Sequence, residues 1–197
     1  LFLCSLPSIT GRTSSKSSVF CGCDLLTTLS NRDFVCGFSE AVKVSLLKDP
    51  SLFSQLCKHA PAIRARNMEV SRPVLRASAK LHLAHITTGG DPFEMLEARP
   101  LDFGHWSAHK LETMSDFSLR HGEAVAIGSA LDVLYTRRMG HLPREATERI
   151  LTLLERLGFE LFGNELLHED ESGTLQVING LEEFREHIGG DLTICLL

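Results

Sequence analysis

The chain has 197 residues, of which 43% are hydrophobic and 23% charged, as in an ordinary soluble globular protein. Its formal net charge of -5 offers no basic footprint, so a nucleic-acid partner is not expected. No apolar run approaches the roughly 18 residues of a membrane-spanning helix, so no membrane partner is expected either. The six cysteines lack the paired spacing of a zinc ribbon or a disulfide framework, which favours reduced thiols in a cytoplasmic protein.

The first predicted elements are short. Residues 1–18 begin with Leu1 and are rich in serine and free of acidic residues, which suits a truncated sequence at least as well as a transit peptide. Residues 19–21, Val-Phe-Cys, are predicted to form a short strand. Asp24 then precedes three leucines that indicate a short helix or turn.

Apolar residues at helical spacing dominate the rest of the chain. We expect a first helix after Gly37 that Pro50 ends, and then helices over 74–86, 105–112, 121–139 and 143–157. Gly158 is expected to close the last of these helices. Residues 192–197 are apolar and partly β-branched, and they are predicted to form a strand. The sequence therefore predicts a mostly α-helical fold.

Three histidines form the densest group of chemically active residues. His105, His109 and His121 fall within seventeen residues, in the segments GHWSAH and RHGEAVAIG. His105 and His109 are four residues apart, so one face of a helix presents both imidazoles. Histidine is the commonest ligand of such metals and a common proton-transfer group, so the group favours a metal or catalytic site over structural histidines.

A metal site of this kind needs a further ligand. A catalytic zinc usually has three protein ligands and one open position, so two histidines require a carboxylate from elsewhere. Glu40 is the best candidate, because it lies in the helical segment GFSEAVK and shares a face with Lys43. From spacing alone, an exposed Glu–Lys pair on a helix surface explains these two residues equally well.

Three segments resemble blocks of the 3-dehydroquinate synthase superfamily, the sugar phosphate cyclases: GFSEAVKVSLLKD at 37–49, LDFGHWSAHKLE at 101–112 and LRHGEAVAIG at 119–128. The resemblance implies that residues 37–197 form the helical, metal-binding C-terminal domain of an α/β plus α protein. Residues 19–36 would be a remnant of the nucleotide-binding domain, and 1–18 are unmatched. We expect most of that Rossmann-like domain to be missing, because no glycine-rich phosphate loop follows a strand.

The resemblance also assigns roles to individual residues. By motif, the metal ligands fall on Glu40, His105 and His121. The catalytic residues fall on Lys43, His109 and, by a looser correspondence, Lys80. The substrate-binding candidates are Asp102 and His187; at His187, in REHIGG, a solvated histidine at a helix end is the simpler explanation.

The central block indicates a branch of the superfamily. Dehydroquinate synthases typically have L-N-x-G-H-T-x-G-H there, whereas this chain has LDFGHWSAH, which resembles the 2-epi-5-epi-valiolone synthases. An ionised Asp102 in place of asparagine only accepts hydrogen bonds, so it would bind different substrate hydroxyls. The implied function is cyclisation of sedoheptulose 7-phosphate to 2-epi-5-epi-valiolone with loss of phosphate. Family members are commonly homodimers, and the resemblance implies the same here.

The implied chemistry requires a divalent metal, zinc or cobalt, and NAD that is regenerated in each cycle. NAD takes a hydride from a ring hydroxyl, the metal polarises that oxygen, phosphate leaves, the ketone is reduced again, and an aldol step closes the carbocycle. His109 would transfer a proton, and Lys43 and Lys80 would stabilise negative oxygens.

Three other outcomes remain open. The chain could be a 3-dehydroquinate synthase, a metal-dependent alcohol dehydrogenase-like enzyme, or a non-catalytic remnant. We also expect the polypeptide alone to bind NAD poorly and to turn over little or nothing.

Overall fold

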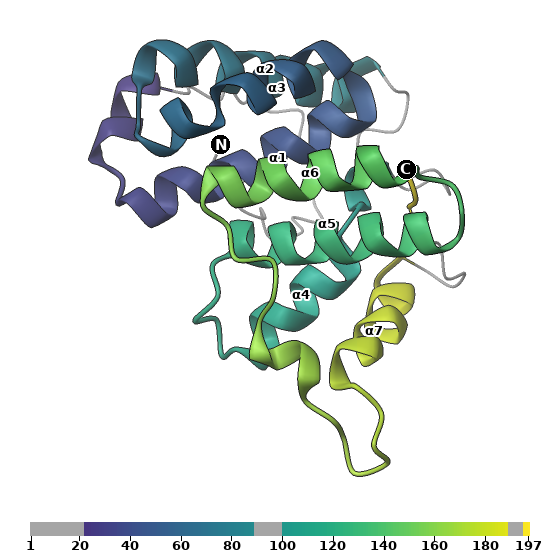
Figure 1. Ribbon diagram of the computed structural model, residues 1–197. Helices are drawn as coiled ribbons and strands as arrows, with labels where there is room; N and C mark the ends of the chain where they lie inside the picture. The colour runs from purple at the N-terminus through teal and green to yellow at the C-terminus, as the bar shows by residue number, and fades with distance from the viewer. Residues whose placement is uncertain (1–21, 89–99, 189–194) are drawn as a thin grey trace, which may run out of the picture.

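The computed structural model describes residues 22–88, 100–188 and 195–197, and these residues are mainly α-helical (Figure 1). The α-helices are α1 (Asn31–Lys48), α2 (Pro50–Arg64), α3 (Met68–Thr88), α4 (His105–Met114), α5 (His121–Arg138), α6 (Arg144–Leu157) and α7 (Asn179–Ile188). Short 3₁₀ helices lie at η1 (Cys23–Thr28), η2 (Pro100–Asp102), η3 (Asn164–Leu167) and η4 (Gln176–Ile178). Within the described ranges there is one isolated β-bridge and no strand, which confirms the predicted mostly α-helical fold.

Local capping explains where the first two helices begin. The Ser30 side chain accepts a hydrogen bond from the Asp33 backbone N–H at 3.1 Å, so α1 begins at Asn31. The predicted start after Gly37 is therefore wrong, because this cap lies seven residues earlier and Gly37 is inside the helix. Pro50 ends α1 as predicted and occupies the first turn of α2, where its missing N–H costs nothing.

The later boundaries are closer to the predictions. Helix α3 begins at Met68, before the predicted start at residue 74, because the Asn67 side chain accepts from the backbone N–H of Glu69 at 3.0 Å. Helix α4 begins at His105 and α5 at His121, as predicted. Helix α6 ends at Leu157, with Gly158 as its C-cap.

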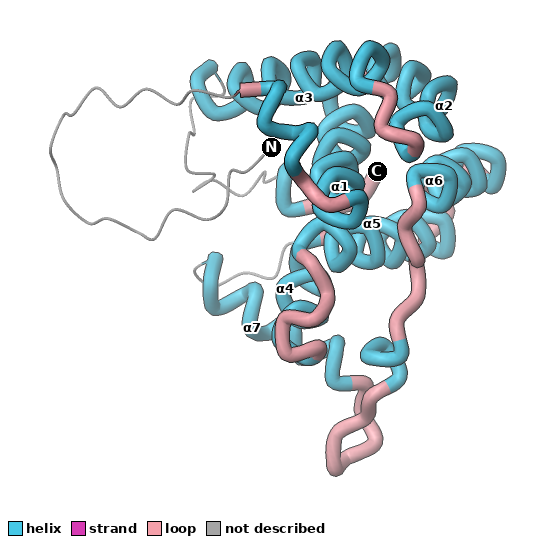
Figure 2. Tube along the Cα trace, turned by 90° about the vertical axis from the view of Figure 1, so that its left-hand side faces the viewer, coloured by secondary structure: helices cyan, strands magenta, loops and turns pink. Residues whose placement is uncertain are grey.

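Helix α5 is the central element of the described structure. It packs against α1, α4 and α6, while α2 and α3 cover the far side of α1 (Figures 1 and 2). One hydrophobic core joins α1, α2, α3, α5 and α6, with Phe38, Leu56 and Leu154 fully buried. A second, smaller core joins α4 and α5 around Leu111 and Val125. The helices that carry Glu40, His105 and His121 therefore meet along α5.

The ends of the chain bear on two predictions. The predicted strand at 19–21 lies outside the described residues. The strand predicted at 192–197 is wrong for residues 195–197, which have no regular structure, while 192–194 lie outside the described residues. Cys195 and Leu197 instead pack against the larger helical core, so their apolar character is explained by burial among helices.

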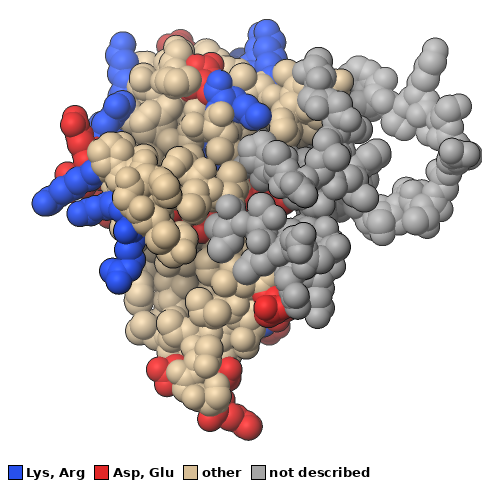
Figure 3. All heavy atoms as spheres, turned by 90° about the vertical axis from the view of Figure 1, so that its right-hand side faces the viewer, with Lys and Arg blue, Asp and Glu red and all other residues tan. Residues whose placement is uncertain are grey.

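The described surface bears on the expectations for membrane and nucleic-acid binding. Among the described residues, no helix combines the length and the apolar character needed to cross a membrane. On the face shown in Figure 3, lysine and arginine side chains lie along the left edge and in the upper part, and acidic side chains gather at the lower tip. The described residues on that face therefore form no continuous basic patch for a nucleic acid.

Candidate metal centre

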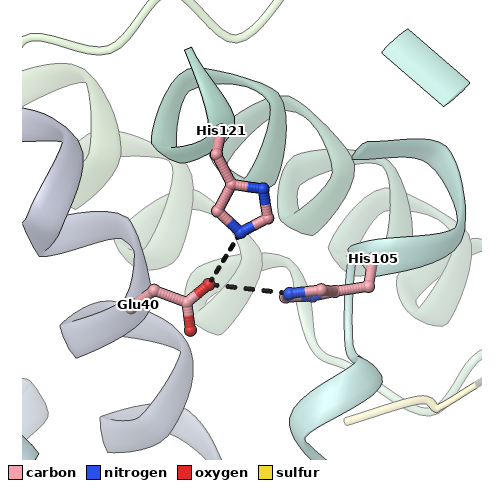
Figure 4. A group of neighbouring side chains, drawn as sticks. All are labelled: Glu40, His105 and His121. Carbon is pink, nitrogen blue, oxygen red and sulfur yellow. Dashed lines mark ion pairs between the residues drawn. The ribbon is translucent and has the colours of Figure 1, made fainter. Parts of the chain in front are cut away.

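Three helices bring Glu40, His105 and His121 together (Figure 4). Glu40 projects from the middle of α1, whereas His105 and His121 are the first residues of α4 and α5. The Glu40 Oε1 atom lies 3.6 Å from His105 Nε2 and 3.7 Å from His121 Nε2. His105 and His121, which follow Glu40 by 65 and 81 positions in the sequence, thus place nitrogen atoms around one of its carboxylate oxygens.

Lys43 is part of this cluster and is buried. Its side chain is 3% exposed, and its Nζ lies 2.8 Å from Glu40 Oε2 and donates to the Leu101 carbonyl oxygen at 2.7 Å. An exposed Glu–Lys pair, the alternative explanation of this spacing, is therefore excluded. Burial opposes ionisation of Glu40, but the Lys43 charge and the two histidines outweigh it and hold the Glu40 pKa well below its usual range.

His105 has the properties of a neutral ligand. Burial, reinforced by the Lys43 charge, lowers its pKa to about 3, so the imidazole carries no charge at neutral pH. Its Nδ1 lies 3.3 Å from the Phe103 carbonyl oxygen, which can only accept a hydrogen bond. A proton on Nδ1 satisfies that contact and leaves the Nε2 lone pair directed toward Glu40.

Glu112 of α4 contacts two of the histidines. Its Oε2 atom lies 3.0 Å from His121 Nδ1 and 3.5 Å from His109 Nδ1. The hydrogen bond to Glu112, together with the nearby Glu40 carboxylate, raises the pKa of His121 to about 9. Burial of Glu112 works against its ionisation, but the nearby imidazoles of His109 and His121 lower its pKa to about 2. His109 itself is 59% exposed, and its ring centroid lies 5.5 Å from that of His105.

The donor atoms suit a divalent metal. The candidate ligand atoms of Glu40, His105 and His121 all lie within 4.8 Å of one another. Ligands about 2.1 Å from a tetrahedral zinc are about 3.4 Å apart, close to the 3.6 and 3.7 Å found here. Glu40 Oε1 is buried and has no hydrogen-bond partner, a costly state for a carboxylate oxygen that a metal would relieve. One glutamate and two histidines suit zinc, and cobalt fits the same donors.

Two glycines allow the three helices to approach this closely. A Cβ on Gly122 would lie 2.3 Å from the Cys36 carbonyl oxygen of α1. A Cβ on Gly128 would lie 2.0 Å from the Gly104 carbonyl oxygen, which precedes α4. Only a residue without a side chain fits at either contact, so these glycines set the distances from α5 to α1 and to α4.

Asp132 is a buried residue that the sequence did not single out. One of its carboxylate oxygens accepts from the Gly104 backbone N–H at 2.7 Å, and the other accepts from Trp106 Nε1 at 2.8 Å. These two donors flank His105, so Asp132 holds the start of α4 against α5. Trp106 and Asp132 are 26 residues apart, so no local spacing reveals their contact.

We expect Trp106→Phe to lower the free energy of unfolding by about 2 kcal/mol, because it leaves a buried carboxylate oxygen without a partner. Burial raises the pKa of Asp132 to about 6, so the stability that depends on Asp132 falls as pH rises through that value. The indole N–H offsets part of this loss by stabilising the ionised carboxylate. The penalty of the substitution should therefore be larger above pH 6 than below it.

Urea denaturation at two pH values measures this penalty. Tyr135→Phe is the matched control, because it removes a hydroxyl from a 46% exposed aromatic residue of α5 and should change stability by no more than about 0.5 kcal/mol. Equal stability of Trp106→Phe and Tyr135→Phe would contradict the role of Asp132.

The remaining predicted site residues are less closely tied to this cluster. Lys80 is exposed on α3, and no interaction described for it joins it to the glutamate and histidines. Asp102 is partly buried in η2, three residues before His105. His187 lies in α7, but its side chain is outside the described part of the structure. A cleft of about 800 Å³ lies nearby, between the start of α1, the start of α5 and residues 157–165, and contains none of the predicted site residues.

Comparison with known proteins identifies the region that contains the cluster. The family model described as 3-dehydroquinate synthase C-terminal matches residues 37–178. A 2-epi-5-epi-valiolone synthase of Streptomyces glaucescens is 34% identical over 139 residues, which are 70% of this chain and 35% of that protein. A 3-dehydroquinate synthase of Halorhodospira halophila is 35% identical over 135 residues, which are 68% of this chain and 38% of that protein.

A solved structure shares the fold. ValA, a 2-epi-5-epi-valiolone synthase from Streptomyces hygroscopicus subsp. jinggangensis 5008 with NAD+ and Zn2+ bound, aligns with a TM-score of 0.77 and 25% identity. The alignment covers 88% of this chain and 47% of ValA. The chain thus spans less than half the length of these proteins. Its own residues 37–178, which match the family model, include Glu40, His105 and His121.

Proposed function

Because this chain belongs to the 3-dehydroquinate synthase family through the family's C-terminal domain, we propose that it is the metal-binding part of a sugar phosphate cyclase. The observation that carries the proposal is the convergence of His105 Nε2 and His121 Nε2 on the unpartnered Oε1 of Glu40. These three residues would hold the metal, zinc or cobalt. NAD is proposed as the second cofactor, and the similar structure of ValA was solved with both NAD+ and Zn2+.

The chain's own residues suit distinct parts of the chemistry. When bound, the metal would polarise a substrate oxygen, and NAD would accept and return a hydride. Lys43 Nζ lies beside the metal ligands, where it can stabilise negative charge on an oxygen. His109 borders His105 and His121 with its ring exposed, so it can exchange a proton with a bound substrate. Lys80 remains a proposed catalytic residue, and Asp102 and His187 remain proposed contacts to the substrate.

We propose sedoheptulose 7-phosphate as the substrate and 2-epi-5-epi-valiolone as the product. Asp102 and Trp106, in place of the asparagine and threonine typical of dehydroquinate synthases, support this choice. The second candidate is a 3-dehydroquinate synthase, which the 35% identity to the Halorhodospira halophila protein supports equally well. Sequence identity does not separate the two substrates, so the choice depends on the central block.

Product analysis tests the proposal. The chain, alone and joined to the unmatched N-terminal part of the Streptomyces glaucescens relative, is given zinc, NAD and either sedoheptulose 7-phosphate or the precursor of 3-dehydroquinate. We expect phosphate release and a valiolone product from sedoheptulose 7-phosphate in the joined protein, and little turnover by the chain alone. Formation of 3-dehydroquinate would favour the second candidate. A joined protein that binds zinc but turns over neither substrate would support a non-catalytic remnant.

A further inference from the structure

Glu112 holds a central position in the histidine cluster without being one of the three predicted ligands. It lies on α4, three residues after His109, and its side chain is only 17% exposed. Its Oε2 atom lies 3.0 Å from His121 Nδ1, within the usual range for a hydrogen bond. The same oxygen is 3.5 Å from His109 Nδ1, beyond that range, so His121 is the principal partner.

The chemistry of this contact determines the form of His121. An ionised carboxylate only accepts hydrogen bonds, so the imidazole nitrogen that faces it must carry a proton. With Nδ1 protonated and directed at Glu112, the other nitrogen, Nε2, lies 3.7 Å from Glu40 Oε1. The contact therefore leaves Nε2 of His121 as the nitrogen that would coordinate a metal. It also restrains rotation of the His121 ring, whose side chain is 46% exposed.

We propose that Glu112 is a positioning residue that orients His121 for metal binding through its Nδ1–H. The inference rests on the proposed metal centre and adds a residue that acts on the metal through His121. Carboxylates that accept from the outer nitrogen of a ligating histidine orient the ring and raise its basicity, and their loss typically costs about 10–100-fold in metal affinity. His105 receives the same kind of support from the Phe103 carbonyl oxygen.

Zinc affinity measured by competition with a chromophoric chelator tests this role without any assay of catalysis. We expect Glu112→Ala to raise the zinc Kd by about 10–100-fold and Glu112→Gln by less, since the amide oxygen can still accept a hydrogen bond. Glu183→Ala is the control, because this carboxylate pairs with Lys110, the residue after His109, and should leave the Kd within about twofold of wild type.

A double-mutant cycle separates positioning from general destabilisation. If Glu112 acts through His121, adding Glu112→Ala to a His121→Ala protein should cause no further loss of zinc affinity. The proposal would be overturned if Glu112→Ala lowered zinc affinity by the same factor in the wild-type and His121→Ala proteins. A zinc Kd for Glu112→Ala within twofold of wild type would overturn it too. Failure of the wild-type chain to bind zinc would instead reject the metal centre itself, and with it the proposed function.

Discussion

Gly122→Ala is expected to lower the free energy of unfolding by about 3 kcal/mol and to weaken metal binding at the same time. The added Cβ would lie 2.3 Å from the Cys36 carbonyl oxygen and 2.7 Å from the Cys36 Cα, and these backbone atoms cannot rotate away. Helices α1 and α5 must therefore separate. Cys36 is one turn before Glu40 on α1, and Gly122 follows His121 on α5, so the separation would lengthen the Glu40–His121 distance of 3.7 Å.

Urea denaturation and zinc titration of the same variant measure both effects. Gly22→Ala is the control, because its Cβ would meet only the Leu25 side chain at ordinary contact distances of 3.5 and 3.6 Å. It should alter stability by less than about 1 kcal/mol and leave zinc affinity unchanged. A Gly122→Ala protein as stable as Gly22→Ala would contradict the close contact between α1 and α5.

Lys43→Met is expected to destabilise the metal-free protein by about 3 kcal/mol, because it removes the nearest positive partner of the Glu40 carboxylate. Methionine fills nearly the same volume, so the loss reports the charge and the hydrogen bond to the Leu101 carbonyl oxygen rather than a cavity. The Glu40 side chain is 29% exposed, which places the expected cost at the lower end for a broken buried ion pair.

Unfolding in the presence of a chelator measures this cost, since a bound metal would itself compensate the Glu40 charge. Lys48→Met is the control, because Lys48 is an exposed residue in the last turn of the same helix and should contribute only about 0.5 kcal/mol through the helix dipole. If the two methionine variants were equally stable, the Lys43–Glu40 pair would contribute nothing to the folded state.

The parts of this structure that depend on neighbouring residues were predictable from the sequence. Apolar spacing and end signals predicted α4, α5 and α6, and the four-residue separation placed His105 and His109 on one helical face. The first helix was predicted to begin after Gly37 because the clear amphipathic pattern starts there. Gly37 is instead inside α1, whose start at Asn31 is set by the Ser30 cap.

The parts that depend on tertiary contacts were not predictable from spacing. From their spacing, Glu40 and Lys43 could equally well be an exposed pair on a helix surface. Only the resemblance to the cyclases predicted that Glu40 is a metal ligand. The burial of Glu40 and Lys43 results from the packing of α1 against α5 and η2, which no local pattern encodes. Asp132 and Glu112 were missed for the same reason. Asp132 of α5 has its partner Trp106 on α4, and Glu112 of α4 has its partner His121 on α5. The ligand roles, NAD binding, the domain division and the homodimer remain predictions.

The metal content of the purified chain tests the central claim most directly. We expect close to one zinc or cobalt per chain, and a large loss of metal in both Glu40→Ala and His121→Ala, because each removes one of the three proposed ligands. Glu145→Ala, which removes an exposed glutamate from the first turn of α6, should retain the metal. A wild-type chain that takes up no metal, or metal that persists in both ligand variants, would contradict a centre formed by Glu40, His105 and His121.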